Sequence, residues 1–102
     1  MRAPFALALV LAFAPGCGRK ATHAECTEML DRYLGMQIAR GPEMASLPAG
    51  QAPALIELRK AEKKATSGYL EKQAQCEKEV SRREYDCAMA TTDPNIWEAC
   101  ID

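Results

Sequence analysis

The chain has 102 residues and a formal net charge of −1, because 13 Lys and Arg residues face 14 Asp and Glu residues. Without an excess of positive charge the chain has no general attraction to a polyanion, so we expect no nucleic-acid partner. A chain of this length forms one domain and buries only about 60–65% of its unfolded surface, and cross-links are the usual remedy for so small a core.

Residues 1–16 have the composition of an export signal. Arg2 gives the positive start, about twelve small and apolar residues follow up to Ala14, and Gly16 precedes Cys17. The apolar stretch is shorter than the roughly twenty residues that span a bilayer, which argues against an uncleaved anchor. A cysteine directly after such a segment resembles the bacterial lipoprotein signal, whose thiol is acylated and becomes the first mature residue. An ordinary secretory signal is the alternative, because Ala14 and Gly16 also satisfy the small-residue rule for cleavage.

The cysteine count favours lipidation of Cys17. An exported chain with five cysteines keeps one thiol unpaired, whereas acylation of Cys17 leaves four, enough for two disulfides. The resemblance then implies a membrane lipid on Cys17 and a location in the cell envelope. It also divides the chain into a signal peptide over 1–16, a tether over 17–21 and a single helical domain over 22–102.

The first residues of the tether bear on its surroundings. In well-studied lipoproteins, aspartate after the acylated cysteine resembles an inner-membrane retention signal, so Gly18 favours the outer membrane. Arg19 and Lys20 either lie near lipid headgroups or belong to a solvated linker, and the sequence leaves both open.

The first predicted helix covers residues 22–40. Thr22 and Glu25 have the Thr-x-x-Glu spacing of a capping box, and Gly41-Pro42 ends the helix. Between them, apolar residues recur every three or four positions on one face. This stripe consists of Cys26, Met29, Leu30, Tyr33, Leu34 and Ile38.

Residues 41–53 are rich in proline and glycine and predict a loop. We expect a second, long helix over 53–91, on which an eleven-residue spacing relates Leu58 to Tyr69 and Val80, close to three full turns. Thr66-Ser67-Gly68 is its weak point, because a mid-helix glycine costs about 1 kcal/mol relative to alanine. We expect a kink there and keep a full break open.

A short third helix is expected over 94–101. Asp93 is a favourable N-cap, and Pro94 suits the first helical position because its missing N–H leaves no donor unpaired. Together the three segments predict an all-α fold, a disulfide-stapled helical hairpin with a short third helix.

Helix geometry narrows the pairing of the four remaining cysteines. On one helix, Cys76 and Cys87 would lie about 16 Å apart along the axis, too far for a disulfide. Cys87 and Cys100 lie at equal distances from the Asp93-Pro94 turn, which favours Cys87–Cys100 and, by elimination, Cys26–Cys76. The second pair has an offset of nine residues, about 13 Å, that the loop or the kink must absorb. Pairing Cys26 with Cys87 enlarges that offset to about 30 Å.

The C-terminal third has a recognisable pattern of cysteine and aromatic residues. Cys76, ten residues, the segment 85–90, then Trp97 and Cys100 resemble a pattern in small exported helical proteins of deltaproteobacteria. The resemblance covers about 25 residues and carries no assigned activity. It implies a disulfide-stapled helical hairpin and nothing about chemistry.

Catalytic and metal chemistry have weak support. The chain has one histidine, His23, which lacks a nucleophile and base around it, so we expect no enzyme and no cofactor. His23, Cys26, Met29 and Met36 contain the soft ligands that copper(I) prefers. A solvated histidine beside a structural disulfide explains the same residues more simply, and we expect no metal.

Three residues form a candidate contact surface: Trp97, Tyr69 and Met89. Aromatic side chains dominate the binding energy of many interfaces. Packing of the third helix on the second is the structural alternative for Trp97. The sequence thus favours a small lipoprotein that acts by protein–protein contact as a structural or accessory subunit, with an unidentified envelope protein as partner. A ligand- or inhibitor-type binding module is the second hypothesis, and copper handling is the third.

Overall fold

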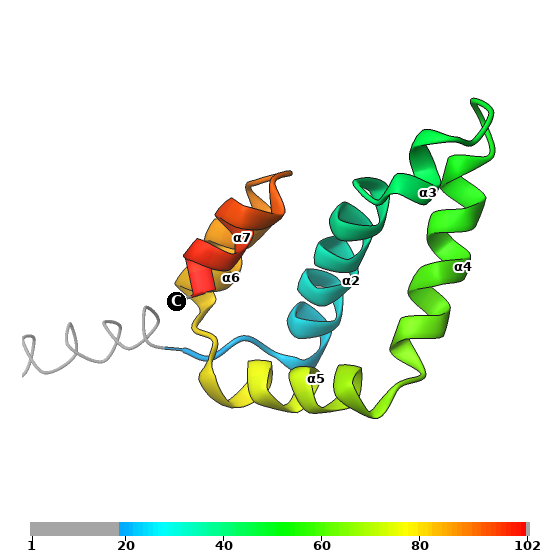
Figure 1. Ribbon diagram of the computed structural model, residues 1–102. Coiled ribbons are helices and arrows are strands. Elements are labelled where there is room, and N and C mark those ends of the chain that lie inside the picture. The colour runs from blue at the N-terminus through cyan, green and yellow to red at the C-terminus, as the bar shows by residue number, and fades with distance from the viewer. Residues whose placement is uncertain (1–18, 102) are drawn as a thin grey trace, which may run out of the picture.

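The computed structural model describes residues 19–101, so Cys17 and the predicted signal peptide lie outside the described residues. The described part is all-α and carries two disulfides, which confirms the predicted fold class (Figure 1). Its helices are α2 (His23–Ala39), α3 (Pro42–Ala45), α4 (Ala52–Lys64), α5 (Ser67–Glu79), α6 (Arg82–Met89) and α7 (Pro94–Ile101). Between residues 19 and 101, no helix combines the length and apolar character required to cross a membrane.

The ends of α2 and α7 follow the predicted capping signals. Thr22 and Glu25 form the capping box, in which each side chain accepts a hydrogen bond from the other residue's backbone N–H. At the start of α7, the backbone N–H of Asn95 donates to Oδ1 of Asp93 at 2.8 Å. These side chains satisfy backbone donors that a helix start leaves unpaired, so both helices begin where the sequence predicts.

The prediction of one helix over 53–91 is wrong, because two breaks divide it into α4, α5 and α6. The first break is at the predicted weak point, where Thr66 caps α5 and accepts from the backbone N–H of Tyr69 at 3.2 Å. The second was not predicted. Val80 is extended, and Ser81 begins α6 with a full capping box to Glu84. The backbone of an N-cap residue is not helical, so Ser81 cannot continue α5 while it caps α6.

The two breaks fold the predicted long helix around α2. In Figure 1, α4 runs beside α2, α5 crosses below both, and α6 and α7 form a hairpin on the other side of α2. The loop expected over 41–53 contains the four-residue helix α3, which lies between the last turn of α2 and the first turn of α4. As a result, α2 contacts α4, α5, α6 and α7 and is the central helix of the domain.

The apolar core lies at the end of α2 that is nearest to α5, α6 and α7. Met29 and Cys26 are its largest fully buried side chains, and Tyr33, Tyr69, Tyr85 and Met89 pack against it. The buried residues of this core are Ala21, Cys26, Met29, Leu30, Cys76, Val80, Ala88 and Trp97. The cluster takes residues from the chain entry and from four helices, so its burial depends on both breaks in the predicted long helix.

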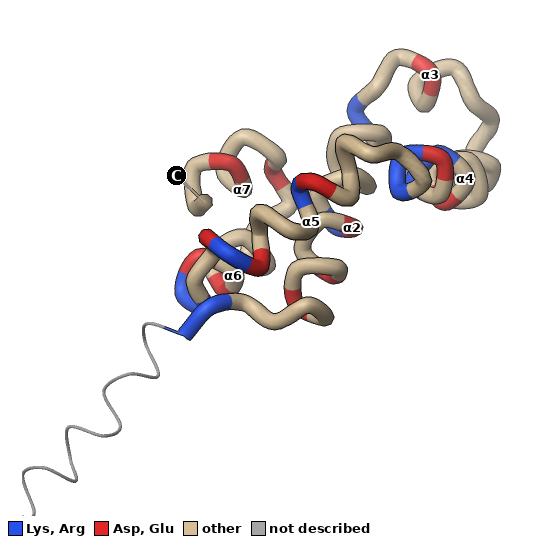
Figure 2. The backbone as a smooth tube through the Cα atoms, turned by 90° about the horizontal axis from the view of Figure 1, so that it is seen from below, with Lys and Arg blue, Asp and Glu red and all other residues tan. Residues whose placement is uncertain are grey.

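The contact between α2 and α4 is made largely by charged residues. Leu58 shares its predicted helix face with Tyr69 and Val80, yet it is 53% exposed, whereas Lys60 is buried. Nζ of Lys60 lies 3.0 Å from Oδ2 of Asp31, and Nζ of Lys64 lies 2.5 Å from Oδ1 of the same carboxylate. Burial opposes the charged form of Asp31, but hydrogen bonds from Lys64 and Lys60 outweigh it and lower its pKa. Figure 2 shows basic and acidic residues close together along α4.

Candidate functional site

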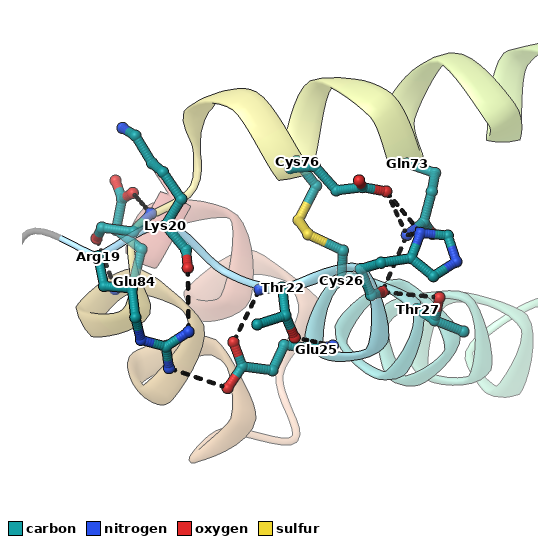
Figure 3. The surroundings of a disulfide bond; sticks show 12 residues. Arg19, Lys20, Thr22, Glu25, Cys26, Thr27, Gln73, Cys76 and Glu84 are labelled. Carbon is teal, nitrogen blue, oxygen red and sulfur yellow. Dashed lines mark hydrogen bonds and ion pairs between the residues drawn. A yellow bond between two sulfur atoms is a disulfide. The ribbon is translucent and has the colours of Figure 1, made fainter.

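The Cys26–Cys76 disulfide joins the first turns of α2 to the last turns of α5. Its Cα atoms are 6.0 Å apart, and both residues are buried in the core (Figure 3). The predicted pairing is confirmed. The nine-residue offset disappears because α5 turns across the end of α2 after the break at Thr66, instead of continuing along it.

The Cys87–Cys100 disulfide closes the hairpin of α6 and α7, as predicted, with Cα atoms 5.7 Å apart. Its surroundings differ from those of the first disulfide, because Cys87 is exposed and Cys100 is half-buried. The hairpin loop is also tied to α2, since Nε and Nη2 of Arg32 donate to the carbonyl oxygen of Thr91 at 3.2 and 3.0 Å.

His23 lies on the exposed side of the buried disulfide. Its Nδ1 is 2.7 Å from Oε2 of Glu77, and Gln73 donates to the His23 carbonyl oxygen and to Glu77 (Figure 3). Hydrogen bonds from His23 and Gln73 lower the pKa of Glu77. Cys26 is bonded to Cys76 and Met29 is fully buried, so neither sulfur is available as the copper(I) ligand that the third hypothesis needs. Among residues 19–101, no group of three or more His, Cys, Asp or Glu side chains is placed to hold a metal ion.

Trp97 belongs to the core, which agrees with the structural alternative of packing against its own domain. It is only 7% exposed, and its ring stacks on that of Tyr33 with centroids 4.3 Å apart. The structural alternative placed Trp97 against the second predicted helix; the structure adds this contact with α2. Tyr69 and Met89 are half-buried against the same core, and neither of them faces the groove described next.

A groove of about 630 Å³ lies between α2, α5 and α7, and we call it the Trp97 groove. Buried apolar side chains form its floor: Met29, Leu30, Cys76, Val80 and Trp97. Exposed polar and charged side chains surround the floor: Lys72, Gln75, Glu79 and Glu98, with half-buried Glu84. An apolar floor with a charged rim can bind an apolar group of a partner and select the charges beside it.

Two groups in the groove wall are unusual. Nε1 of Trp97 is the one buried side-chain donor or acceptor of residues 19–101 without a hydrogen-bond partner. Tyr33 donates its hydroxyl to Glu98 and accepts from Nε2 of Gln37 at 2.7 Å. Burial, together with the hydrogen bond to the negative Glu98, raises the pKa of Tyr33 to about 12. The tyrosine therefore stays neutral at ordinary pH and links α2 to α7.

Tyr33, Glu98 and Lys72 contribute to the groove but were not predicted as site residues. Tyr33 was assigned only to the apolar stripe of the first helix, and no sequence pattern relates it to Glu98, 65 positions further along the chain. The signal that could have helped is Ser81-x-x-Glu84, the same capping pattern as Thr22-x-x-Glu25. Recognising it predicts the turn at Val80, after which α6 and α7 fold back toward α2 and both α5 and α7 contribute to the groove.

Comparison of the chain with family models, with curated proteins and with solved structures finds no match. The function is therefore argued from the groove and from the sequence.

Proposed function

We propose that this protein is a small lipoprotein, anchored to the membrane through Cys17, that binds a partner protein of the cell envelope in the Trp97 groove as an accessory subunit. The observation that carries the proposal is the groove itself, which combines a buried apolar floor with a rim of charged side chains. Stable interfaces have this anatomy, with an apolar centre and a polar, solvated edge.

The groove is well suited to a protein partner because it is held rigidly. The buried disulfide supplies part of its floor through Cys76, and the Tyr33–Glu98 hydrogen bond joins two of its walls. A preformed site avoids the entropic cost of ordering side chains on binding. Its rim has three glutamates and one lysine, which favours a partner with basic residues beside its apolar anchor.

A ligand-binding module is the second candidate, and one observation favours it. The groove volume of about 630 Å³ lies within the range of about 300–1,000 Å³ that is typical of small-molecule pockets. An envelope lipid or metabolite with an apolar body and a cationic group would match the same floor and rim.

The two candidates are separated by isolating the membrane-extracted protein with rim variants. Glu79→Lys reverses a charge on the groove rim, and Glu71→Lys makes the same change on α5 at an exposed position outside the groove. We expect one protein to co-purify in stoichiometric amount with the wild type and with Glu71→Lys, and about tenfold less with Glu79→Lys. Equal recovery with both variants would rule out the groove as the binding site.

The chain provides its own probe for a small ligand. Trp97 is its one tryptophan and forms part of the groove floor, so its fluorescence reports occupation of the groove. A saturable change in emission with a small-molecule extract of the envelope, in the absence of any co-purifying protein, would replace the accessory-subunit proposal by the ligand-binding one.

A further inference from the structure

The chain entering the domain is hydrogen-bonded to the junction between α5 and α6. The backbone N–H of Ala21 donates to the carbonyl oxygen of Val80 at 2.9 Å, and that of Arg82 donates to the carbonyl oxygen of Arg19 at 2.8 Å. Lys20 and Ser81 thereby form an antiparallel bridge. The expected tether over 17–21 is thus shorter than the sequence suggests, because residues 19–21 are part of the folded domain.

Side chains hold the same segment in place. Oε2 of Glu25 lies 3.5 Å from Nη2 of Arg19 (Figure 3). The same oxygen lies 2.8 Å from Nη1 of Arg82, and Ala21 is buried in the core. A hydrogen bond from the backbone N–H of Thr22 lowers the pKa of Glu25, and the two arginines lower it further. Glu25 therefore stays charged and joins the entering chain to α6.

We infer that residues 19–21 and 80–83 form a membrane-contact surface that lies against anionic phospholipid headgroups. The inference rests on the proposed function, because it needs a lipid on Cys17. Only Gly18 then separates the acylated residue from the hydrogen-bonded segment, so the Cα atoms of Cys17 and Arg19 are at most about 7 Å apart. The headgroup region is about 5–7 Å thick on each side of the bilayer. The domain has no room to lift away from the surface.

The charges of this surface match phosphate groups. Lys20 and Arg83 are exposed, and neither has an ion-pair partner among the residues that the structure describes. Three nearby acids are engaged within the fold: Glu25 with two arginines, Asp86 with Arg82, and Glu84 as the cap of Ser81. Glu79 precedes the surface on α5 and accepts a hydrogen bond from Gln75. In Figure 3, Lys20 points away from Glu25 and into solvent. Basic residues held at this distance are attracted to anionic lipid.

This placement orients the rest of the molecule. Val80 and Glu84 belong both to the α5–α6 junction and to the Trp97 groove, so the groove begins beside the bilayer. The α3 end lies on the far side of the domain from the chain entry (Figure 1). A partner bound in the groove therefore meets this protein at the membrane surface.

The test is amine labelling of the acylated full chain in vesicles of phosphatidylethanolamine and phosphatidylglycerol, read by mass spectrometry. Lys20 is the probe, and Lys63, which is exposed at the end of α4 and separated from the junction at Val80 by the whole of α5, is the internal control. Relative to the same chain carrying Cys17→Ser without vesicles, we expect labelling of Lys20 to fall about fivefold or more and that of Lys63 by less than about twofold.

A lengthened variant separates the short link from simple charge attraction. About ten Gly and Ser residues inserted between Gly18 and Arg19 leave the domain unchanged and give it freedom to move. We expect protection of Lys20 to persist at high salt in the wild type and to be lost at high salt in the lengthened variant, where only screened charge attraction remains.

The outcomes distinguish the two proposals. An N-terminal peptide without an acyl group would overturn the proposed anchoring and this inference with it. An acylated wild type in which Lys20 and Lys63 label at the same rate on vesicles would overturn the membrane-contact surface alone. So would a lengthened variant that keeps full protection at high salt.

Discussion

The two halves of α2 lie in different surroundings. Around its first half, Cys26, Met29 and Leu30 are buried among residues of α5, α6 and α7. From the middle of α2 onward the packing is looser: Lys60 and Lys64 of α4 contact Asp31, and Tyr33 and Met36 are only partly buried against the core. The predicted apolar stripe runs along both halves, yet it becomes a core only where several helices converge. An apolar stripe on a helix is thus necessary for a core. The stripe is buried only where several other helices pack against it.

The difference between the halves has a functional counterpart. The Trp97 groove and the proposed membrane-contact surface both lie at the core half, where the backbone is fixed by a disulfide and by the bridge at Lys20. The α4 half contains charged contacts that water can replace. Local opening should therefore begin at α3 and α4 and leave the groove intact.

Removing the buried disulfide should have the largest effect on stability. On the chain-entropy model, Cys26→Ala with Cys76→Ala loses about 4 kcal/mol, because the bond closes a loop of 50 residues, and Cys87→Ala with Cys100→Ala loses about 3 kcal/mol. Burial of the first disulfide should widen this gap, since its removal also leaves a cavity. Urea unfolding of the two double variants measures both losses. A larger loss for the exposed disulfide would show that neither loop length nor burial decides which disulfide stabilises the domain more.

A pair of truncations tests the comparison without touching a disulfide. Met29→Ala removes a core side chain that is 1% exposed and should cost about 2–5 kcal/mol. Leu58→Ala removes a leucine of α4 that is 53% exposed and should change the free energy of unfolding by less than about 0.5 kcal/mol. Thermal unfolding of both variants gives the two values. Similar losses would mean that α4 is packed as firmly as the core.

Local signals in the sequence predict much of the fold. The capping residues Thr22 and Asp93 fix the starts of α2 and α7, and the equal distances of Cys87 and Cys100 from the turn predict their disulfide. These signals need only a few consecutive residues or one hairpin. The Ser81 cap is of the same kind, but the regular spacing of apolar residues across it favours a continuous helix and hides it.

The rest depends on where the helices lie after the chain turns. The stacking of Tyr33 on Trp97 and the burial of Lys60 require two breaks in the middle segment to be known first. The bridge between Lys20 and Ser81 is a contact between an extended segment and a helix junction, and no periodicity in the sequence marks it. The groove combines residues from four parts of the chain, so its composition follows from the tertiary arrangement and not from a motif.

A smaller, local effect is expected when the charged contact of α4 is removed. Asp31→Asn keeps the shape of the side chain but leaves the buried Lys60 with Glu57 as its remaining ion-pair partner. Because the carboxylate is partly exposed and screened by solvent, the loss should be about 1 kcal/mol. Amide hydrogen exchange should show α4 opening about fivefold more often, with α6 and α7 unchanged. Exchange that rises equally in α6 and α7 would show that the two halves of α2 unfold together.

The pH dependence of the same contact gives a more specific readout. Because hydrogen bonds from Lys64 and Lys60 outweigh the cost of burial and lower the pKa of Asp31, the unfolded chain takes up this proton at a higher pH than the folded chain does. Its contribution is therefore complete above the unfolded pKa of about 4 and is lost as the pH falls through the lower folded value. Glu43, whose pKa Arg59 lowers, adds a similar dependence in α3 and α4. The difference in α4 exchange between wild type and Asp31→Asn isolates the part due to Asp31, and it should vanish in acid. A difference that persists well below pH 3 would mean that Asp31 holds α4 by its shape rather than by its charge.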